Sequence, residues 1–321
     1  MPRPKHVHTA SAKEPPAGWA LRILLTPGSV SAAFRTAIVL LALTAGAVCA
    51  EPPDISSVPP DLALPAVSHT APAPSLRVPI AAPGWEATAV SHLLYLPADW
   101  KAAARFPVLV EWTGNQYKSP TGDSCPGTPE GAKLGFGISG GVGCIWLTLP
   151  YLDKAGKLPV TTWWGNAPEY DPQPTLAYCR AAVREVCARF GGDPARVVLV
   201  GFSRGAIAVN YLGLHDDETA RLWRGFVCYS HYDGVRRWNW SATDMESAPA
   251  RLKRLAGRPQ FVCGEAANAE DTRLFLERHG LLGSGEFTFC GTGFRNHDDA
   301  WILRPSEART RLRDWFRQLV H

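Results

Sequence analysis

The sequence predicts an α/β domain in which helices cover both faces of a mostly parallel, twisted sheet. Three observations support this prediction. From residue 106 onward, short apolar runs alternate with longer amphipathic segments, as strands alternate with crossover helices. One apolar run ends at a serine in a glycine-rich turn that leads into a helix. Finally, about 270 residues remain once an N-terminal export signal is removed, and this length suits one large α/β domain.

The first 50 residues read as a signal peptide. The apolar run 37–48 follows Arg35 and precedes Cys49 and Ala50, so we expect signal peptidase to cut after Ala50 and the protein to be exported to the periplasm or the medium. The run is shorter than the roughly 20 residues that span a bilayer, and we expect no stable membrane insertion after cleavage. Lipidation of Cys49 is the alternative, although Val48 is bulky for the position before a lipidated cysteine.

The mature chain carries no net charge. Residues 1–50 hold five of the 33 Lys and Arg residues and one of the 29 Asp and Glu residues, which leaves 28 of each sign. A nucleic-acid-binding surface needs a basic stripe, and the sequence shows none. We therefore expect no nucleic-acid partner.

Residues 51–83 are expected to form a proline-rich tether outside the fold. They include nine prolines and few large apolar side chains, a composition typical of extended linkers. The catalytic domain is accordingly expected to span residues 84–321.

Seven cysteines remain after the signal is removed. The odd number argues against a fully paired disulfide framework, and several lie in apolar runs that are typical of buried free thiols. Cys125 and Cys144 flank a glycine-rich loop and form the one pair for which we consider a disulfide.

The elements of the predicted sheet can be placed by their apolar patterns. The segment 92–96 is a candidate antiparallel edge strand. Helices are predicted over 172–190, which stops at two glycines, and from Ser306 to the C-terminus. Ligands of such sheets bind at the carboxyl ends of the strands. Buried strands are predicted over 107–112, 144–149, 197–200, 225–229, 260–263 and 286–289.

Two serines occur in a Gly-x-Ser-x-Gly pattern, and their surroundings distinguish them. Ser203 follows the strand-like run 197–200 and precedes a helix that is apolar nearly all round. This is the context of a nucleophile elbow, in which glycines allow a sharp turn between strand and helix. Ser139 has no strand before it, and we interpret it as a loop serine.

An activated serine also needs donors for the oxyanion that forms when it attacks an acyl carbon. The backbone N–H of Arg204, at the start of the helix after Ser203, can supply one. We expect the second from the loop after strand 107–112, where Gly114 or Asn115 brings the backbone close.

The general base is predicted to be His297. A serine hydroxyl needs a neutral imidazole to accept its proton, and His297 follows the last predicted strand and precedes the final helix. Four other histidines of the domain are less well placed, and they are His215, His231, His279 and His321.

The acid that orients this histidine is harder to place. Asp233 follows the strand 225–229 and precedes a glycine, and we rank it first. Asp271 ranks second, because it is expected to belong already to a helix. Glu265 ranks third, because it comes very early after the strand 260–263. Asp298 and Asp299 adjoin the histidine and are expected to cap or brace its loop.

The arrangement resembles the α/β-hydrolase superfamily, and within it secreted esterases and depolymerases related to poly(3-hydroxybutyrate) depolymerases and feruloyl esterases. The resemblance covers residues 106–319. It rests on Gly201-Phe-Ser203-Arg-Gly205 between strand and helix, on Phe190-Gly-Gly-Asp-Pro-Ala-Arg-Val before that strand, and on Asn296-His297. The chain departs from the superfamily at the usual position of the acid, where Ala267 or Asn268 stands, which leaves the assignment of the acid open.

Two long insertions, 113–143 and 150–171, are expected to lie over the site. Trp163 and Trp164 in the second could stack on a sugar or aromatic ring, or could simply pack as the core of a lid, which we favour. The sequence His215-Asp216-Asp217 offers oxygen and nitrogen ligands, but a solvated helix end explains it better than a metal site. No cofactor is expected.

These features predict a secreted serine hydrolase that cleaves a small-molecule or polymeric carboxylic ester through an acyl-enzyme on Ser203. The nearest alternative is a serine peptidase, since the same machinery cleaves amides. A glycan- or wall-binding protein on a non-catalytic hydrolase scaffold is the alternative from another class.

Overall fold

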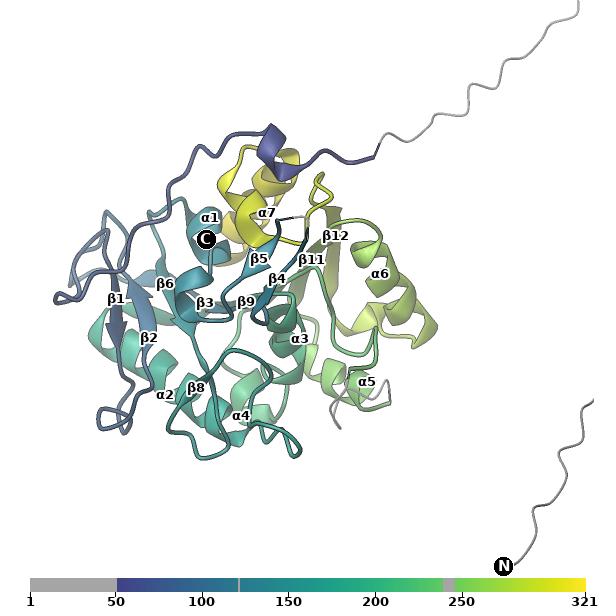
Figure 1. Cartoon of the computed structure of the whole chain (residues 1–321). Helices are drawn as coiled ribbons and strands as arrows, with labels where there is room; N and C mark the ends of the chain where they lie inside the picture. The colour runs from purple at the N-terminus through teal and green to yellow at the C-terminus, as the bar shows by residue number, and fades with distance from the viewer. Residues whose placement is uncertain (1–50, 121, 239–245) are drawn as a thin grey trace, which may run out of the picture. The chain divides into compact units, whose positions relative to one another are not determined.

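An eight-stranded sheet runs through the part of the chain that the computed structural model describes, residues 51–120, 122–238 and 246–321 (Figure 1). Its strand order is β1-β2-β6-β3-β9-β10-β11-β12, and all neighbours from β6 to β12 are parallel. The first two strands add an antiparallel edge. The strands are β1 (Arg77–Ile80), β2 (His92–Tyr95), β3 (Phe106–Trp112), β6 (Ile145–Leu149), β9 (Gly192–Phe202), β10 (Gly225–Tyr229), β11 (Pro259–Gly264) and β12 (Glu286–Gly291).

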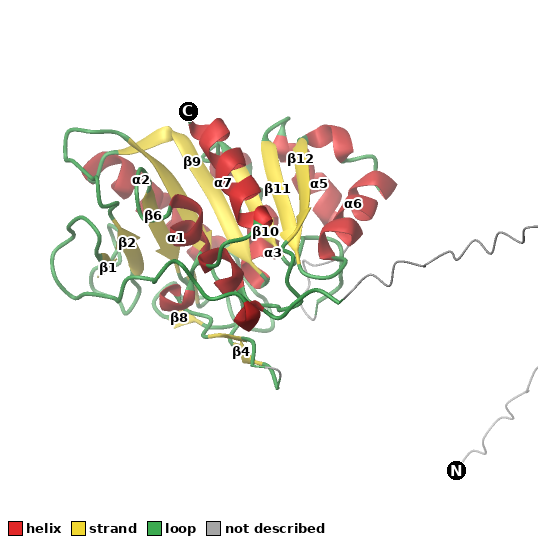
Figure 2. Cartoon of the chain, turned by 90° about the horizontal axis from the view of Figure 1, so that it is seen from above, coloured by secondary structure: helices red, strands yellow, loops and turns green. Residues whose placement is uncertain are grey.

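Helices cover both faces of this sheet because successive side chains of a strand point to opposite faces. In β3, Val108 and Val110 belong to a core with α2, α3, α5 and α6, whereas Leu109 belongs to a second core with α1 and α7. Figure 2 shows α1 and α7 beside one another over the sheet. The helices are α1 (Leu134–Ser139), α2 (Gln173–Arg189), α3 (Arg204–Tyr211), α4 (Asp217–Ala220), α5 (Ser247–Leu252), α6 (Asn268–Arg278) and α7 (Glu307–Val320).

The predicted α/β architecture is confirmed. All six strands that were predicted from apolar runs are present, and both predicted helices lie within a residue or two of their expected bounds. The prediction that all six are buried is wrong for β12, which forms the edge of the sheet and is only partly buried. Ser306 caps the final helix by accepting a hydrogen bond from the backbone N–H of Arg309. Two short hairpins in the insertions, β4 (Tyr117–Lys118) with β5 (Ser124–Cys125) and β7 (Tyr151–Leu152) with β8 (Pro159–Val160), complete the strands of the described residues.

Glu111 is a fully buried carboxylate in the otherwise apolar strand β3. One of its oxygens accepts from the backbone N–H of Leu134, and the other accepts from Gly135 and from the indole of Trp146, at 2.8–3.1 Å. A carboxylate can accept several such bonds at once. Glu111 therefore joins the sheet to the first turn of α1.

The prediction that residues 51–83 form a tether outside the fold is wrong. The described residues from 51 onward belong to one compact unit. Residues 77–80 form the edge strand β1, and Ile55, in a single 3-10 turn, is buried against the domain. The prolines keep the segment extended, but its few large apolar side chains are the ones that pack. The predicted signal peptide, residues 1–50, lies outside the described residues.

The candidate disulfide between Cys125 and Cys144 is absent, because the seven cysteines of the described residues are free thiols. Cys125 lies in the β4–β5 hairpin and Cys144 directly precedes β6. Both are buried, which agrees with the interpretation of the cysteines as apolar core residues.

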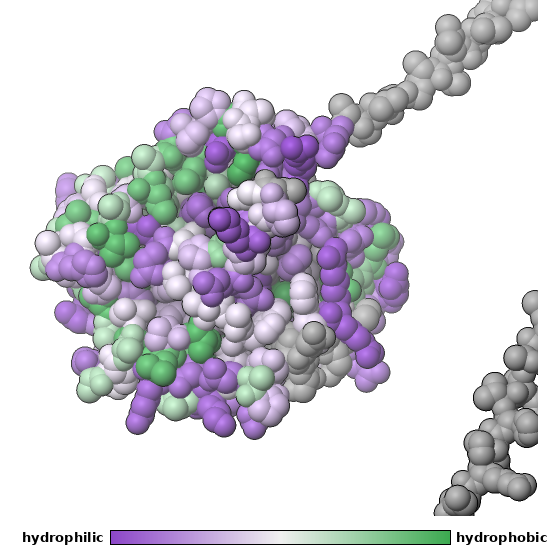
Figure 3. Space-filling view, viewed as in Figure 1, coloured by the Kyte–Doolittle hydropathy of each residue, from purple (hydrophilic) through white to green (hydrophobic). Residues whose placement is uncertain are grey.

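Few large apolar side chains of the described residues are strongly exposed. Polar and apolar residues are interspersed on the face seen in Figure 3, so this face shows no broad apolar patch of the kind that marks a stable interface. No helix of the described residues is both long and apolar enough to cross a bilayer. The most exposed large apolar residues of the described chain are Val142, Leu158, Leu274 and Leu282.

Candidate active site

Ser203 lies in a sharp turn between β9 and α3. Its backbone has φ 54° and ψ −117°, a left-handed conformation that is strained for a residue with a side chain. The flanking glycines make the turn possible. A Cβ on Gly201 would lie 2.2 Å from the backbone of Gly205, and a Cβ on Gly205 would lie 1.9 Å from the carbonyl oxygen of Trp112. This is the geometry of a nucleophile elbow.

Ser139, the other serine in a matching pattern, lies elsewhere. It is the last residue of α1 rather than a loop residue, and its hydroxyl donates to the carbonyl of Gly135 in the same helix at 2.9 Å. Glycine at 137 serves packing, because a Cβ there would lie 2.4 Å from Ile302. The two patterns therefore differ in the structural reason for their glycines.

His297 follows β12 and brings its imidazole to Ser203. Its Nε2 lies 3.1 Å from the Ser203 Oγ, and its Nδ1 lies 2.7 Å from a carboxylate oxygen of Glu265. A proton on Nδ1 is shared with the carboxylate, which leaves Nε2 free to accept the serine proton. The structure thus joins a hydroxyl, an imidazole and a carboxylate in one line of contacts.

The prediction that Asp233 orients this histidine is wrong. Asp233 is buried, and its two oxygens bind Nε and Nη2 of Arg251 at 2.9 and 3.0 Å. Asp271 lies in the first turn of α6, with its nearest ion-pair partner at 3.9 Å. Glu265, ranked third from the sequence, is the carboxylate that reaches His297. It directly follows β11 and reaches the imidazole from this early position.

Burial and hydrogen bonding act in opposite directions on Glu265. Its side chain is mostly buried, which raises the pKa of a carboxyl group. The hydrogen bond and the charge of His297, together with the Ser230 hydroxyl, outweigh burial and leave the pKa of Glu265 below its ordinary value. The group is therefore ionised at neutral pH, as an orienting carboxylate must be.

Ser230 is a member of the site that the sequence did not indicate. It follows β10 with a φ of 81°, and its hydroxyl lies 2.8 Å from the His297 Nδ1 while donating to Glu265 at 2.9 Å. The hydroxyl thus touches both partners of the imidazole–carboxylate pair. The only sequence signal was its place at the end of a strand, one strand before that of Glu265.

The loop that carries His297 is held from several elements. Asp123 accepts from the backbone N–H of His297 at 3.2 Å and from the side-chain amide of Asn296 at 2.9 Å. Asn296 also donates to Asp54 at 3.1 Å and accepts from the backbone N–H of Ile55 at 2.8 Å. These contacts connect the N-terminal segment to the histidine loop. Asp298 and Asp299 brace the loop as expected, the first by capping a 3-10 turn and the second by binding Lys133.

Both expected oxyanion donors flank Ser203. Arg204 opens α3, and the first backbone N–H groups of a helix have no partner within it. The loop after β3 passes directly beside the nucleophile, since a Cβ on Gly114 would lie 3.2 Å from the Ser203 Cβ. The backbone at 113–115 is therefore close enough to share an oxyanion with Arg204.

Aromatic rings surround the imidazole. Phe202 lies 4.9 Å from the His297 ring, and His231 lies 5.1 Å from it. Burial, and then the charge of His297, lower the pKa of His231 to about 4, so this neighbour stays neutral. Trp164 is fully buried on Tyr211 at 4.9 Å, which agrees with the interpretation of the second insertion as a packed core.

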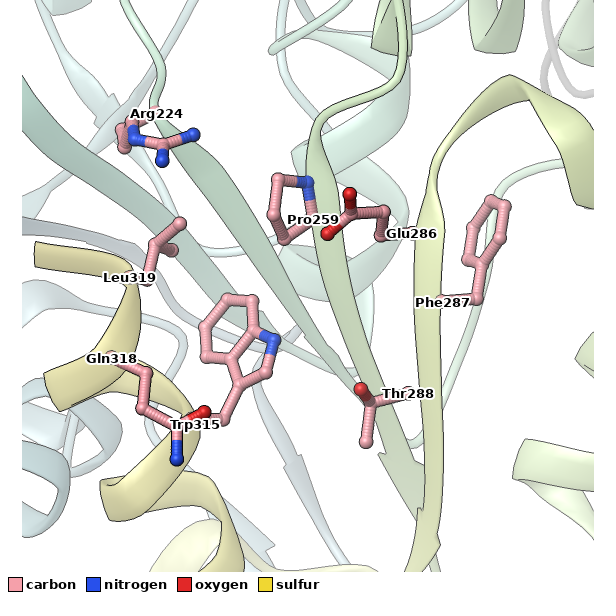
Figure 4. A pocket seen from close by; sticks show the side chains of 8 residues that line it. All are labelled: Arg224, Pro259, Glu286, Phe287, Thr288, Trp315, Gln318 and Leu319. Carbon is pink, nitrogen blue, oxygen red and sulfur yellow. The ribbon is translucent and has the colours of Figure 1, made fainter.

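Other features of the described residues lie away from this site. A cavity of about 330 Å³ opens between α7 and the starts of β11 and β12, and Figure 4 shows Trp315 and Thr288 on its wall. It lies at the amino ends of the strands, whereas Ser203 lies at the carboxyl ends. The described residues contain no group of three or more His, Cys, Asp and Glu side chains that could hold a metal ion.

Comparison with known proteins shows the fold. No protein-family model matches the chain, and no curated protein matches it. Among solved structures, dipeptidyl peptidase 4 of Porphyromonas gingivalis is 12% identical with a TM-score of 0.50, over 75% of this chain and 35% of that one. A thermostable esterase from Pseudomonas putida is 16% identical with a TM-score of 0.49, over 83% and 84%. A second thermostable esterase is 14% identical with a TM-score of 0.47, over 76% of this chain and 62% of that one.

The chain has the α/β-hydrolase fold. It spans 62% of the second thermostable esterase, less than two thirds of its length, and 35% of the dipeptidyl peptidase. The narrower resemblance to poly(3-hydroxybutyrate) depolymerases and feruloyl esterases stays a prediction.

Proposed function

We propose that the protein is an exported serine hydrolase that cleaves carboxylic esters through an acyl-enzyme on Ser203. The observation that carries this proposal is the line of contacts from the Ser203 hydroxyl through His297 to Glu265, at 3.1 and 2.7 Å. Hydroxyl, imidazole and carboxylate in this order form the arrangement that activates a serine near neutral pH.

Acylation begins when the Ser203 Oγ attacks the acyl carbon of the ester and its proton passes to the His297 Nε2. The carbonyl oxygen becomes an oxyanion, which accepts hydrogen bonds from the Arg204 N–H and from the loop at Gly114. The bond to the alcohol then breaks, and the imidazolium returns the proton to the leaving oxygen. Water, deprotonated by the same imidazole, releases the acid in a second round.

Glu265 acts on His297 rather than on the substrate. It holds the imidazole in the tautomer with a free Nε2 and stabilises the imidazolium that forms in each transition state. Its depressed pKa favours the ionised form that this role needs. Asp233 has no part in this step.

Export is part of the proposal, and the proposed cleavage site lies directly before the first residue that the structure describes. A cut after Ala50 would remove only residues that lie outside the described chain and would leave Glu51 as the first residue. Asp54 and Ile55, which bind Asn296 beside the histidine, would be retained. The proposed cleavage therefore leaves the contacts of the site intact.

Labelling with a fluorophosphonate probe tests the nucleophile. Wild-type protein and Ser139→Ala are expected to be labelled and to hydrolyse nitrophenyl esters, whereas Ser203→Ala should do neither. A parallel panel of peptide substrates separates an esterase from a peptidase. Equal labelling of Ser203→Ala and the wild type would contradict the proposed mechanism, and hydrolysis of peptides but not of esters would make the protein a peptidase.

A further inference from the structure

The side chain of Arg204 is a buried cation beside the nucleophile. It is 1% exposed, its guanidinium lies 3.7 Å from the ring centroid of Tyr151, and its Nη2 donates to the carbonyls of Gly114 and Gly127 at 2.8 and 3.3 Å. Its Nε and Nη1 are buried, its side chain interacts with the Tyr151 phenol, and no carboxylate of the described residues acts on its charge. Burying a charge without a counter-charge is unfavourable, so its presence here calls for a reason.

Burial does not neutralise the Arg204 guanidinium. It lowers the pKa of Arg204 only to about 10, so the guanidinium is positive at neutral pH. The titratable groups that face it are the Tyr151 phenol and the Cys125 thiol, and burial raises the pKa of both. Both neighbours are therefore uncharged, and neither balances the arginine.

A second buried arginine shows what an ordinary arrangement looks like. Arg77 is 3% exposed, lies 4.9 Å from the Trp146 ring centroid and donates to backbone carbonyls at Pro129 and Glu130. Two carboxylates, Glu111 and Glu130, act on its charge. Arg77 thus matches Arg204 in burial and in ring contact but has negative charge nearby, and it is remote from Ser203 in the fold.

The hydrogen bonds of Arg204 and Tyr151 fix the direction of the loop after β3. Arg204 holds the carbonyl of Gly114, and the Tyr151 hydroxyl donates to the carbonyl of Thr113 at 3.0 Å. In a planar trans peptide the C=O and the following N–H point in opposite directions. The N–H groups of Gly114 and Asn115 therefore point away from the arginine and the tyrosine.

We propose that the Arg204 side chain is a positioning residue for the oxyanion. It orients the peptide between Gly114 and Asn115 so that the Asn115 N–H serves as the second donor, and it places a fixed positive charge behind that donor. The negative charge that balances it forms only when Ser203 attacks the ester, so the arginine favours the transition state over the ground state. This inference rests on the proposed function and assigns a second role to Arg204 beside that of its backbone N–H.

Arg204→Met tests the inference, with Arg77→Met as the matched control. Since removal of a direct oxyanion donor costs roughly 10²–10³ in kcat, loss of its support is expected to lower kcat about 10- to 100-fold. KM should stay within about twofold, because the charge acts on the transition state. Affinity for a boronic acid that forms a tetrahedral anionic adduct on Ser203 should fall by the same factor as kcat. Arg77→Met should leave kcat and boronate affinity unchanged.

The matched control separates this role from a structural one. Arg204→Met leaves the carbonyls of Gly114 and Gly127 without their donor, and a buried polar group left unpaired costs about 1–3 kcal/mol. The variant is therefore expected to melt below the wild type, as is Arg77→Met, which removes the side-chain donor to the carbonyls of Pro129 and Glu130, but only Arg204→Met should lose kcat. Should Arg204→Met fail to fold, Tyr151→Phe removes only the hydroxyl that holds Thr113 and should lower kcat and boronate affinity together by several-fold.

Each other outcome overturns the inference. If folded Arg204→Met keeps the kcat and the boronate affinity of the wild type, the inference is refuted while the proposed serine hydrolase activity stands. The same holds for Tyr151→Phe if Arg204→Met does not fold. Equal losses in Arg204→Met and Arg77→Met would reduce it to a general effect of buried arginines. A wild-type protein that neither labels nor hydrolyses esters would remove the proposed function and this inference together.

Discussion

The carboxylates of Glu265 and Asp233 differ in their surroundings, and these surroundings set their roles. Glu265 contacts the imidazole, whereas Asp233 is held by both nitrogens of the Arg251 fork. One carboxylate therefore serves the reaction that we propose, and the other serves the core. A substitution that removes charge but keeps shape should separate the two functions.

Glu265→Gln is expected to lower kcat by about four decades, as loss of the orienting carboxylate does in serine proteases. Its melting temperature should change little, because the amide keeps the shape of the side chain.

Asp233→Asn should behave in the opposite way. Breaking a buried ion pair costs about 3–5 kcal/mol of stability, while the folded fraction should keep its kcat. Ester kinetics and thermal unfolding of the two variants measure both effects, and loss of kcat in Asp233→Asn alone would refute our assignment of the acid.

The Ser230 hydroxyl supports the same pair from the neighbouring strand. Its backbone has a φ of 81°, so Ser230→Gly retains the conformation and removes the CH2OH side chain with its hydroxyl. A hydrogen bond to a charged group contributes about 1.5 kcal/mol or more, which corresponds to about tenfold in kcat. Ser230→Gly should show this loss with little change in KM. Ser230→Ala, which keeps the Cβ but lacks the hydroxyl, should show the same loss if the hydroxyl positions the imidazole, and a kcat equal to the wild type in Ser230→Gly would show that it does not.

At the scale of elements, the strands could be predicted because burial on both faces of a parallel sheet requires apolar residues at consecutive positions. The runs 197–200 and 225–229 therefore identified β9 and β10 without ambiguity. Strand β1 has only four residues, and one of them is a proline, so its pattern carries too little information. The role of Glu265 as the orienting carboxylate could not be predicted either, because it depends on whether one side chain reaches His297 in the folded structure.

Glu111 illustrates how one charged residue in an apolar strand joins two elements. Burial, and then the charge of Asp299, outweigh its hydrogen bonds and raise the pKa of Glu111 to about 7 from a usual 4.5. The folded chain thus holds a proton there that the unfolded chain releases. The contribution of this group to stability is full below about pH 4.5 and declines as the pH rises to about 7.

Glu111→Gln should remove this titration. The difference in unfolding free energy between wild type and variant is expected to change between about pH 4.5 and 7 and to be constant outside that window. Loss of an acceptor oxygen should also destabilise the variant, since each buried donor left without a partner costs about 1–3 kcal/mol. Urea unfolding across the pH range measures both effects. A difference that is independent of pH would mean that Glu111 has the same pKa in the folded and the unfolded chain.

At the scale of the whole molecule, the N-terminal segment is a brace rather than a tether. It adds β1 to the edge of the sheet, and Asp54 and Ile55 bind the loop that carries His297. Its proline content led to the opposite prediction, because composition describes the stiffness of a segment and not the surface on which it lies. The few apolar residues among the prolines, rather than the average composition of the segment, determine where it packs.

Three chains with different N-termini test this brace. A chain of residues 51–321 should match the secreted protein in melting temperature and kcat, and N-terminal sequencing of the secreted protein should give Glu51.

A chain of residues 59–321 keeps β1 but loses two hydrogen bonds to Asn296. At about 1 kcal/mol for each bond, it should fold with a modestly lower melting temperature. Its kcat should fall further than its stability, because the loss falls on the histidine loop. A chain of residues 84–321 lacks β1 and exposes the edge of β2, so it should aggregate. Full activity of the chain 59–321 would show that the histidine loop is held without Asp54 and Ile55. A soluble and active chain 84–321 would support the original prediction that residues 51–83 are a tether outside the fold.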